Sequence, residues 1–180
     1  LSTRIFPAVT FTTPTRNTSS DVEFFSVYAQ DQISLGEYFD VVAGIRYDRF
    51  AIKGTDFIPN PDRNFARTDK KVSPRLGLIW KPSGNASVYS SYSQSFLPRS
   101  GDQFVSMTAA QQNLAPEKFT NLEIGGKWDI RPDLNITAAV FRLDRTNATT
   151  PDPVNPLVSI NVGKTRTKGF ELAATGHILP

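Results

Sequence analysis

Apolar and polar residues alternate along seven segments of this 180-residue chain, and that period of two constrains the fold more than any other feature. The segments are residues 23–35, 39–47, 72–81, 86–93, 121–128, 134–141 and 169–175. Successive side chains of a β-strand point to opposite faces, so this alternation is typical of strands with one apolar face. Because no helical stretch separates the segments, the sequence predicts an all-β, antiparallel up-and-down meander of about seven strands.

The segment 39–47 shows the two faces most clearly. Its apolar row consists of Phe39, Val41, Ala43, Ile45 and Tyr47. In the segment before it, Asp31 interrupts the apolar row. The faces opposite the apolar rows are too charged for a packed core, because they carry Arg46, Asp48, Arg75, Glu123, Lys127 and Glu171.

The connections between the segments alternate strictly in length. Residues 34–37, 81–85 and 130–133 are compact and contain the Gly, Pro, Asn and Asp that tight turns need. Residues 53–70, 97–116 and 147–159 are much longer and rich in Pro, Asn and Asp. Loops of that length are unusual in a compact soluble sheet. In an outer-membrane β-barrel, short turns face the periplasm and long loops face the outside.

Aromatic residues fall near both ends of the predicted strands. Tyr38, Phe39, Trp80 and Trp128 lie near the short turns, and Tyr47, Phe50, Tyr92 and Phe96 lie near the long connections. Eight steps of about 3.3 Å along a strand tilted by about 40° correspond to roughly 20 Å of height. That height is close to the apolar band of such barrels, whose two interfaces select aromatic belts.

Two other architectures share this alternation. The first is a small complete outer-membrane barrel with a structural or adhesive role, in which residues 5–12 supply an eighth strand. The second is a soluble β-sandwich binding module, whose apolar face packs on a second sheet. The loop asymmetry and the aromatic belts favour a curved wall with lipid outside.

Composition and motifs exclude several classes of function. A hydrophobic content of 39% and the lack of a long apolar run exclude membrane-spanning helices, and the absence of Cys excludes disulfides. The 20 basic and 17 acidic residues give a net charge of only +3 and form no basic run, so no nucleic-acid partner is expected. The N-terminal residues do not have the pattern of a signal peptide.

No enzyme activity is expected, because no catalytic constellation stands out. His177 has no metal-ligand partner near it in sequence, and the serines of residues 87–95 lack a Gly-x-Ser-x-Gly elbow. Asp56, Asp62 and Asp69 are spaced too loosely for a calcium loop. We therefore expect no catalytic residues and no metal ligands.

Short motifs recur along residues 22–175. They are Val27-Tyr28-Ala29-Gln30-Asp31-Gln32, Gly44-Ile45-Arg46-Tyr47-Asp48, Ser73-Pro74-Arg75-Leu76-Gly77-Leu78 with Lys81-Pro82, Tyr89-x-x-Tyr92-Ser93, Leu114-x-Pro116-Glu117 with Asn121-x-Glu123-x-Gly125-x-Lys127, Phe141-Arg142, and Arg166-x-Lys168-Gly169-x-Glu171-Leu172. In this order they resemble the barrel signatures of TonB-dependent receptors of the siderophore type.

The resemblance implies an importer of ferric siderophores or similar iron chelates in the outer membrane of a Gram-negative bacterium. It implies a 22-stranded transmembrane barrel filled by a plug domain and driven by the TonB complex. We expect residues 1–180 to form part of the barrel domain, with the plug and the remaining strands outside this chain. The expected partners are the ferric siderophore as transported ligand, outer-membrane lipid and, through the plug, the TonB complex. No directly bound cofactor is expected.

A ferric siderophore is a large, polar and often anionic chelate, so aromatic and cationic side chains at the external mouth would suit it through stacking and charge. In the long connections the candidates are Phe57, Arg63, Phe65, Arg67, Phe96, Arg99 and Phe104. The alternative for each is interfacial anchoring or ordinary loop packing.

Overall fold

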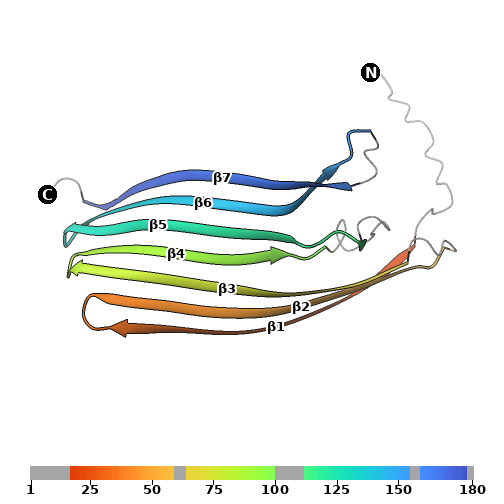
Figure 1. The fold of residues 1–180 in the computed structure, drawn as a ribbon, viewed down its shortest axis with the longest axis horizontal. Helices are drawn as coiled ribbons and strands as arrows, with labels where there is room; N and C mark the ends of the chain where they lie inside the picture. Colours follow the sequence, from red (N-terminus) through yellow and green to blue (C-terminus); the bar gives the residue numbers. More distant parts are fainter. Residues whose placement is uncertain (1–16, 59–63, 100–111, 155–158, 178–180) are drawn as a thin grey trace, which may run out of the picture.

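Seven long strands form one antiparallel sheet in the computed structural model, which describes residues 17–58, 64–99, 112–154 and 159–177. The strands are β1 (Thr18–Leu35), β2 (Phe39–Asp56), β3 (Phe65–Ser83), β4 (Ala86–Leu97), β5 (Glu117–Arg131), β6 (Leu134–Pro151) and β7 (Ser159–Gly176). Each strand pairs with the next in sequence, so the order across the sheet is β1 to β7 (Figure 1). The predicted meander is confirmed.

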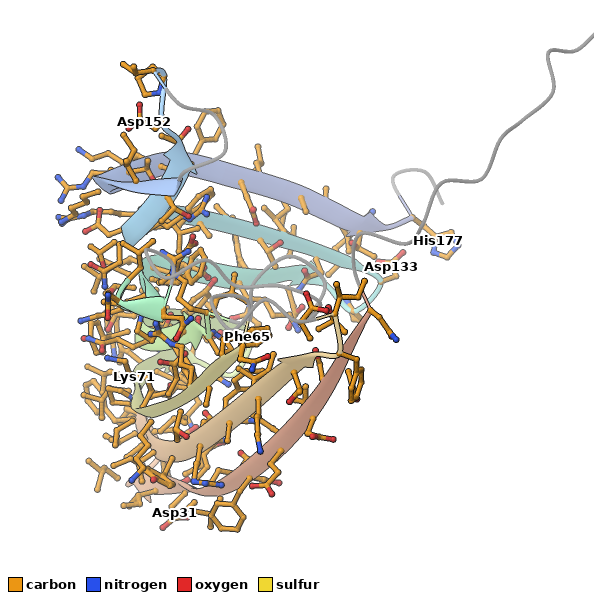
Figure 2. All side chains as sticks on the ribbon, turned by 90° about the vertical axis from the view of Figure 1, so that its right-hand side faces the viewer. Asp31, Phe65, Lys71, Asp133, Asp152 and His177 are labelled. Atoms are coloured by element: carbon orange, nitrogen blue, oxygen red, sulfur yellow. The ribbon has the colours of Figure 1, made fainter. Side chains whose placement is uncertain are left out.

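The sheet is a single layer whose outer edges are β1 and β7 (Figures 1 and 2). The described residues contain no second sheet that could cover the apolar face, as a β-sandwich would require. Residues 5–12, the predicted eighth strand of a small barrel, lie outside the described residues. No helix in the described ranges is long and apolar enough to cross a membrane.

At the end of the sheet that carries the long connections, which we call the long-loop end, the strands extend further than the alternation predicted. The β2–β3 connection shortens from the predicted 53–70 to 57–64, and the β6–β7 connection from 147–159 to 152–158. These predicted bounds were wrong because backbone pairing continues beyond the apolar residues: on β2 the row that begins with Phe39 continues with the charged residues Arg49 and Lys53, which are still paired.

The three tight turns, at what we call the short-turn end, lie where they were predicted. They occupy residues 36–38, 84–85 and 132–133. Gly36 has a φ of 71°, a left-handed conformation that glycine adopts without a Cβ clash. The two ends of the sheet therefore differ in connection length as the sequence indicated.

The two faces of the sheet differ in burial. On β2 the buried side chains Asp40, Asp48, Phe50, Ile52 and Asp56 all lie on one face. Side chains crowd on the concave side of a curved sheet, so we call this the inward face. The opposite, outward face carries the apolar rows, and it leaves Leu76, Ile124, Val140, Phe170 and Leu172 exposed.

Phe50 departs from the predicted aromatic belt. It is an even-numbered residue of β2 and lies on the inward face, 6% exposed, in a cluster with Ile52 and Phe65. Alternation of side chains makes this placement unavoidable, because Tyr47 is outward and Phe50 lies three residues further along the strand. Tyr47, Tyr92 and Phe96 remain on the outward face.

The strands are staggered. Residues that pair across the sheet form a line from Phe39 on β2 through Trp80, Val88 and Gly126 to Ala138 on β6. However, β6 begins at Leu134, four residues before Ala138. The short-turn end therefore shifts by about one residue for each strand. A stagger of constant sign makes strands tilt when a sheet closes into a barrel.

Three aromatic rings lie directly over glycines of the neighbouring strand on the inward face. Phe65 covers Gly54, Tyr89 covers Gly125 and Phe141 covers Gly169. A Cβ added to Gly125 would lie 2.6 Å from Cζ of Tyr89, and one added to Gly169 would lie 2.6 Å from Cζ of Phe141. Only glycine leaves room for these rings.

Candidate ligand-facing site at the long-loop end

All three long connections leave the sheet at one end, because an antiparallel meander returns every second turn to the same edge (Figure 1). The inward side of this end carries ionic groups from several strands. We call Arg67, Asp69, Arg99, Glu117 and Arg145 the loop-end network. It determines how the segment between β4 and β5 joins the sheet.

Asp69 on β3 forms the first half of the network. Arg67 and Asp69 are two residues apart, so both side chains lie on the inward face. Arg67 donates from Nε and Nη2 to Oδ1 of Asp69 at 2.9 and 2.7 Å, and its Nη1 donates to the carbonyl oxygen of Gln112 at 2.5 Å. The backbone N–H of Arg99 donates to Oδ2 of Asp69 at 3.0 Å.

Glu117 at the start of β5 forms the second half. Its two carboxylate oxygens accept from Nη1 of Arg99 at 3.1 Å and from Nε of Arg145 at 2.6 Å. Arg99 also donates to the carbonyl oxygens of Ala115 and Asn147 and to the hydroxyl of Thr149. Arg99 therefore joins the segment after β4 to both β5 and β6.

The two arginines keep Glu117 charged although the residue is only 3% exposed. The hydrogen bond from Arg145 is the largest influence, and burial acts in the opposite direction; the net effect lowers the pKa of Glu117 from its ordinary value of 4.5. The Arg145 guanidinium also lies 5.8 Å from the ring centroid of Phe119. Charge at this end is thus fixed in place by opposite charge.

Four of the residues predicted to contact ligand have structural partners or an outward position. Phe65 is 3% exposed in the cluster with Phe50 and Ile52. Arg67 and Arg99 belong to the loop-end network and meet at Asp69. Phe96 pairs with Lys118 and lies on the outward face, together with Tyr92.

The other three predicted residues differ in accessibility. Phe57 is 63% exposed at the start of the β2–β3 connection, and its backbone N–H donates to the carbonyl oxygen of Asn17 at 2.7 Å. Arg63 and Phe104 lie outside the described residues. Phe57 is therefore the described candidate whose ring is free to meet a ligand.

The inward face also holds a groove that was not predicted from the sequence. It has a volume of about 620 Å³ and is lined by Tyr28, Arg46, Ser73, Arg75 and Ser93, among others. Arg46 donates from Nε to Asp48 at 2.8 Å. The inward parity of Tyr28 and Arg75 was visible in the sequence, but their convergence depends on pairing across four strands. Within the described part of the chain, no three His, Asp or Glu residues are grouped to hold a metal ion.

A staggered single sheet with an apolar outward face, a charged inward face and long loops at one end defines the wall of a transmembrane β-barrel. Comparison with known families specifies which barrel. The family model described as TonB dependent receptor-like, beta-barrel matches residues 2–179, and the chain belongs to this family. Proteins of this family lie in the outer membrane of Gram-negative bacteria.

Two curated relatives carry receptor names. The chain is 32% identical over 165 residues to the probable TonB-dependent siderophore receptor PiuA of Acinetobacter baumannii, covering 87% of this chain and 22% of that protein. It is 31% identical over 167 residues to the probable TonB-dependent receptor BfrD of Bordetella pertussis, covering 88% and 22%. The chain thus spans about a fifth of the length of these relatives.

Solved structures show the same fold. The sheet matches the ferric-catecholate import receptor Fiu of Escherichia coli in its closed form with a TM-score of 0.75 and 23% identity, covering 91% of this chain and 26% of that one. It matches the alcaligin outer-membrane receptor FauA of Bordetella pertussis with a TM-score of 0.66 and 22% identity, covering 91% and 28%.

Proposed function

We propose that this chain forms seven neighbouring strands in the wall of an outer-membrane receptor that takes up ferric siderophores or similar iron chelates with energy from the TonB complex. The family match over residues 2–179 carries the proposal. The names of PiuA and Fiu, a siderophore receptor and a ferric-catecholate import receptor, support this class of ligand. The chain contributes wall and mouth, and its role is transport.

In this proposal, transport depends on this chain and on parts of the protein outside residues 1–180. A plug domain fills the lumen and receives the TonB complex, and further strands close the barrel. An open sheet edge leaves backbone N–H and C=O groups unpaired, which lipid does not tolerate, so β1 and β7 require neighbouring strands. The charged inward face suits contact with water or a polar plug.

Within this function, the long connections form part of the mouth that binds the chelate. Phe57 stacks on the ligand, and Arg63 and Phe104 supply charge and a second ring. Arg67 and Arg99 act as positioning residues, because their guanidinium groups are engaged by Asp69 and Glu117. Phe65 and Phe96 hold the strand ends on the inward and outward faces.

Uptake of radioactive iron tests this proposal. The full-length protein is expressed in a bacterium that lacks its own receptors for the chosen catecholate and hydroxamate chelates. We expect uptake of at least one ferric chelate that stops when the TonB complex is deleted or the proton gradient is collapsed. Uptake of none, or uptake that persists without the TonB complex, would overturn the proposal.

A matched pair of variants tests the ligand role of Phe57. Phe57→Ala should weaken chelate binding by about tenfold, the equivalent of one lost aromatic contact. Tyr38→Ala removes a similarly exposed ring at the short-turn end, 56% against 63% for Phe57, and should leave binding unchanged. Equal binding by both variants would remove Phe57 from the site.

A further inference from the structure

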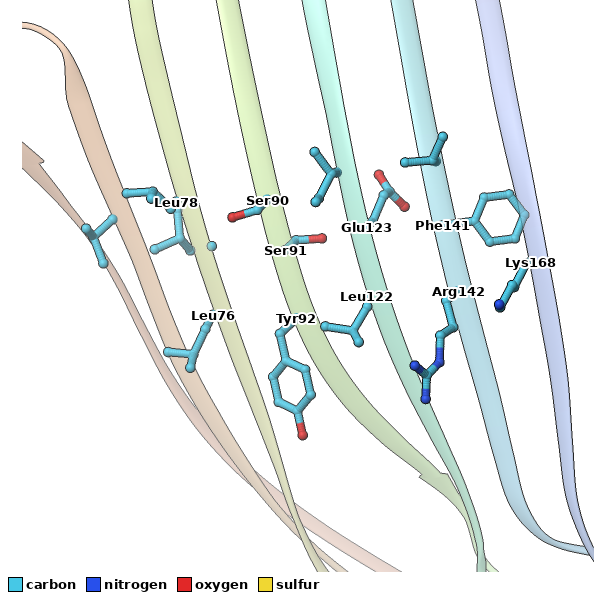
Figure 3. A pocket seen from close by; sticks show the side chains of 15 residues that line it. Leu76, Leu78, Ser90, Ser91, Tyr92, Leu122, Glu123, Phe141, Arg142 and Lys168 are labelled. Atoms are coloured by element: carbon cyan, nitrogen blue, oxygen red, sulfur yellow. The ribbon is translucent and has the colours of Figure 1, made fainter.

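Asp31 is a charged residue in a row that is otherwise apolar. On the outward face of β1 between Phe25 and Leu35, every residue except Asp31 is apolar. Asp31 is exposed and pairs with Ala43 on β2. The same line of paired residues continues across β3 to β5, and Figure 3 shows its members there side by side: Leu76, Tyr92 and Leu122. A single carboxylate therefore lies among aliphatic and aromatic side chains that face lipid.

The depth of Asp31 follows from its distance to the short-turn end. Leu35, the last residue of β1, pairs with Phe39, which pairs with Trp80 in the aromatic belt of that end. Asp31 lies four residues before Leu35. At about 3.3 Å per residue and a tilt of about 40°, this separation corresponds to about 10 Å of depth. The carboxylate thus lies inside the apolar band, with apolar residues toward both of its edges.

Hydrocarbon does not solvate this charge. Long Lys and Arg side chains can extend from within the bilayer to the head groups, but the side chain of Asp is too short to do so. The backbone N–H of Gln32 donates to Oδ1 of Asp31 at 2.8 Å. Among the residues that the structure describes, no Lys or Arg forms an ion pair with Asp31. An ionisable group at this depth requires a partner.

A hollow beside Asp31 indicates what kind of partner fits. It has a volume of about 340 Å³, and its lining on the outward face includes Asp31, Ala29, Ala43, Ile45 and Leu76. The two alanines leave the surface open next to the carboxylate. An arginine or lysine can lay its aliphatic stem along such an apolar surface and place its charged end on a carboxylate. An acyl chain would fill the hollow but would leave the charge of Asp31 unpaired.

The position of Asp31 on β1 indicates where this cation comes from. Asp31 lies at the β1 edge of the sheet (Figure 2). Side chains that are neighbours across two strands are about 4.5–5.5 Å apart, and Ala43 occupies that place on the β2 side. On the other side, the backbone of β1 must pair with another strand of the barrel, which we call the adjoining strand. The adjoining strand therefore supplies the remaining neighbour of Asp31.

We propose that Asp31 and the hollow beside it form a docking site for an arginine or lysine of the adjoining strand. The two charges form an ion pair on the lipid-facing side of the wall. This pair fixes the alignment of the adjoining strand with β1, because a slip by one residue would turn the cation to the inward face. The inference requires only that the wall lies in the bilayer, and it does not depend on chelate uptake.

The sign of a stability change tests this inference. The full-length protein, reconstituted in lipid vesicles, is unfolded with urea as wild type and as Asp31→Leu. A paired Asp31 predicts that the variant leaves a cation alone in lipid, which should raise the equilibrium constant for unfolding by about tenfold or more. An unpaired Asp31 predicts the opposite sign, because leucine would replace a charge that faces lipid. An unchanged or lower constant would therefore overturn the proposal.

Glu23 supplies the matched control on the same strand. It is an outward carboxylate beyond the apolar band, its side chain is 75% exposed, and it is paired with Arg49. Glu23→Leu should change the equilibrium constant for unfolding by less than about threefold, since water solvates the remaining charge. Equal losses in Asp31→Leu and Glu23→Leu would contradict a partner within the bilayer.

Charge reversal identifies the partner. Asp31→Lys places two cations together in lipid and should prevent insertion of the receptor, which loss of heat-modifiable migration reports. Mutagenesis of the rest of the gene should then yield suppressors in which one Arg or Lys, at an outward position of the adjoining strand, is replaced by Glu or Asp. Failure to obtain such suppressors, or suppressors confined to other strands, would overturn the proposal.

Cross-linking distinguishes the adjoining strand from a second copy of the protein. The 180 residues contain no Cys, so Asp31→Cys introduces a single thiol in this part of the wall. A second Cys at the suppressor position should form a disulfide with it within one molecule. If Asp31→Cys instead formed covalent dimers, the site would belong to a contact between two copies and the proposal would be overturned.

Discussion

The part of the sheet at the level of the apolar band and the part at the long-loop end are held together by different interactions. At the level of the apolar band, large side chains such as Leu76, Ile124 and Val140 are exposed, and the strands are joined by backbone hydrogen bonds. At the long-loop end, β2 and β3 bury an apolar cluster of Phe50, Ile52 and Phe65. The buried carboxylates of Asp56, Asp69 and Glu117 also lie there.

The difference between these two parts of the sheet reflects their surroundings. Inside the bilayer, hydrocarbon covers the apolar side chains, so the protein needs no core of its own there. Outside the bilayer, water competes for every polar group, and strands that continue must pack and pair as in a soluble domain. We therefore expect substitutions at the long-loop end to affect stability more than matched substitutions at the level of the band.

The largest effect is expected at Glu117. Glu117→Gln removes the charge that Arg99 and Arg145 share at a site that is 3% exposed, and it should lower the free energy of unfolding by about 3 kcal/mol. Urea titration of the full-length protein in detergent micelles measures the change. If Glu117→Gln unfolds at the wild-type urea concentration, the loop-end network does not stabilise this end.

Gly125 is expected to be an exception at the level of the band, since Tyr89 lies over it. Gly125→Val should lower the free energy of unfolding by about 2 kcal/mol, because the ring must move or the strands must separate. The neighbouring glycine supplies the control: Gly126 faces outward, where an added Cβ meets ordinary contact distances of 3.4 Å and more. Gly126→Val should change stability little, and equal losses in the two variants would contradict this packing.

Acid should weaken the long-loop end selectively. The pKa of Glu117 is lowered in the folded protein, so the stabilisation by its charge is complete above pH of about 4.5 and is lost as pH falls through the lower folded value. Since pH 3.5 lies below the ordinary value of 4.5, part of this stabilisation is lost there, and the loss should be smaller than that in Glu117→Gln. Limited proteolysis between β4 and β5 at pH 7 and pH 3.5 measures it, and the Glu117→Gln variant should show a smaller difference between the two pH values.

The smallest effect is expected at the exposed ion pair of Glu23 and Arg49 on the outward face. Nη1 of Arg49 lies 3.2 Å from Oε2 of Glu23, and the side chains of Glu23 and Arg49 are 75% and 39% exposed. Glu23→Gln should change the free energy of unfolding by less than about 0.5 kcal/mol, because water solvates both charges when they separate. The same urea titration that is used for Glu117 measures it, and a loss as large as that of Glu117→Gln would show that burial is not what distinguishes the two pairs.

The sequence predicted the part of the sheet that the bilayer constrains. Lipid favours an apolar residue at each outward position, which is every second residue of a strand, so residues 39–47 and 134–141 stood out as strands. Beyond the band Arg49, Lys53 and Lys164 occupy outward positions, and the signal disappears although the strands continue. Strand existence was therefore predictable, but the strand ends beyond the band were not.

The candidate site was predictable only in part. Arg-x-Asp pairs such as Arg67 and Asp69 could be read from the sequence, since two-residue spacing puts both side chains on one face. The contact of Arg99 with Glu117 could not, because 17 residues separate them and a connection with no regular pattern brings them together. The contacts of Asp144 on β6 with Lys164 and Arg166 on β7 depend on the register between the two strands, which no local pattern encodes.

The three rings that cover glycines have a consequence for how the wall is assembled. They lie between β2 and β3, β4 and β5, and β6 and β7, the three pairs of strands joined by long connections. In the other pairs a tight turn fixes which residues face each other, whereas a long connection leaves that choice open. If a strand slipped by two residues, each ring would lie opposite a residue that carries a Cβ. One ring and one glycine thus encode, for each such pair, the alignment that its loop cannot specify.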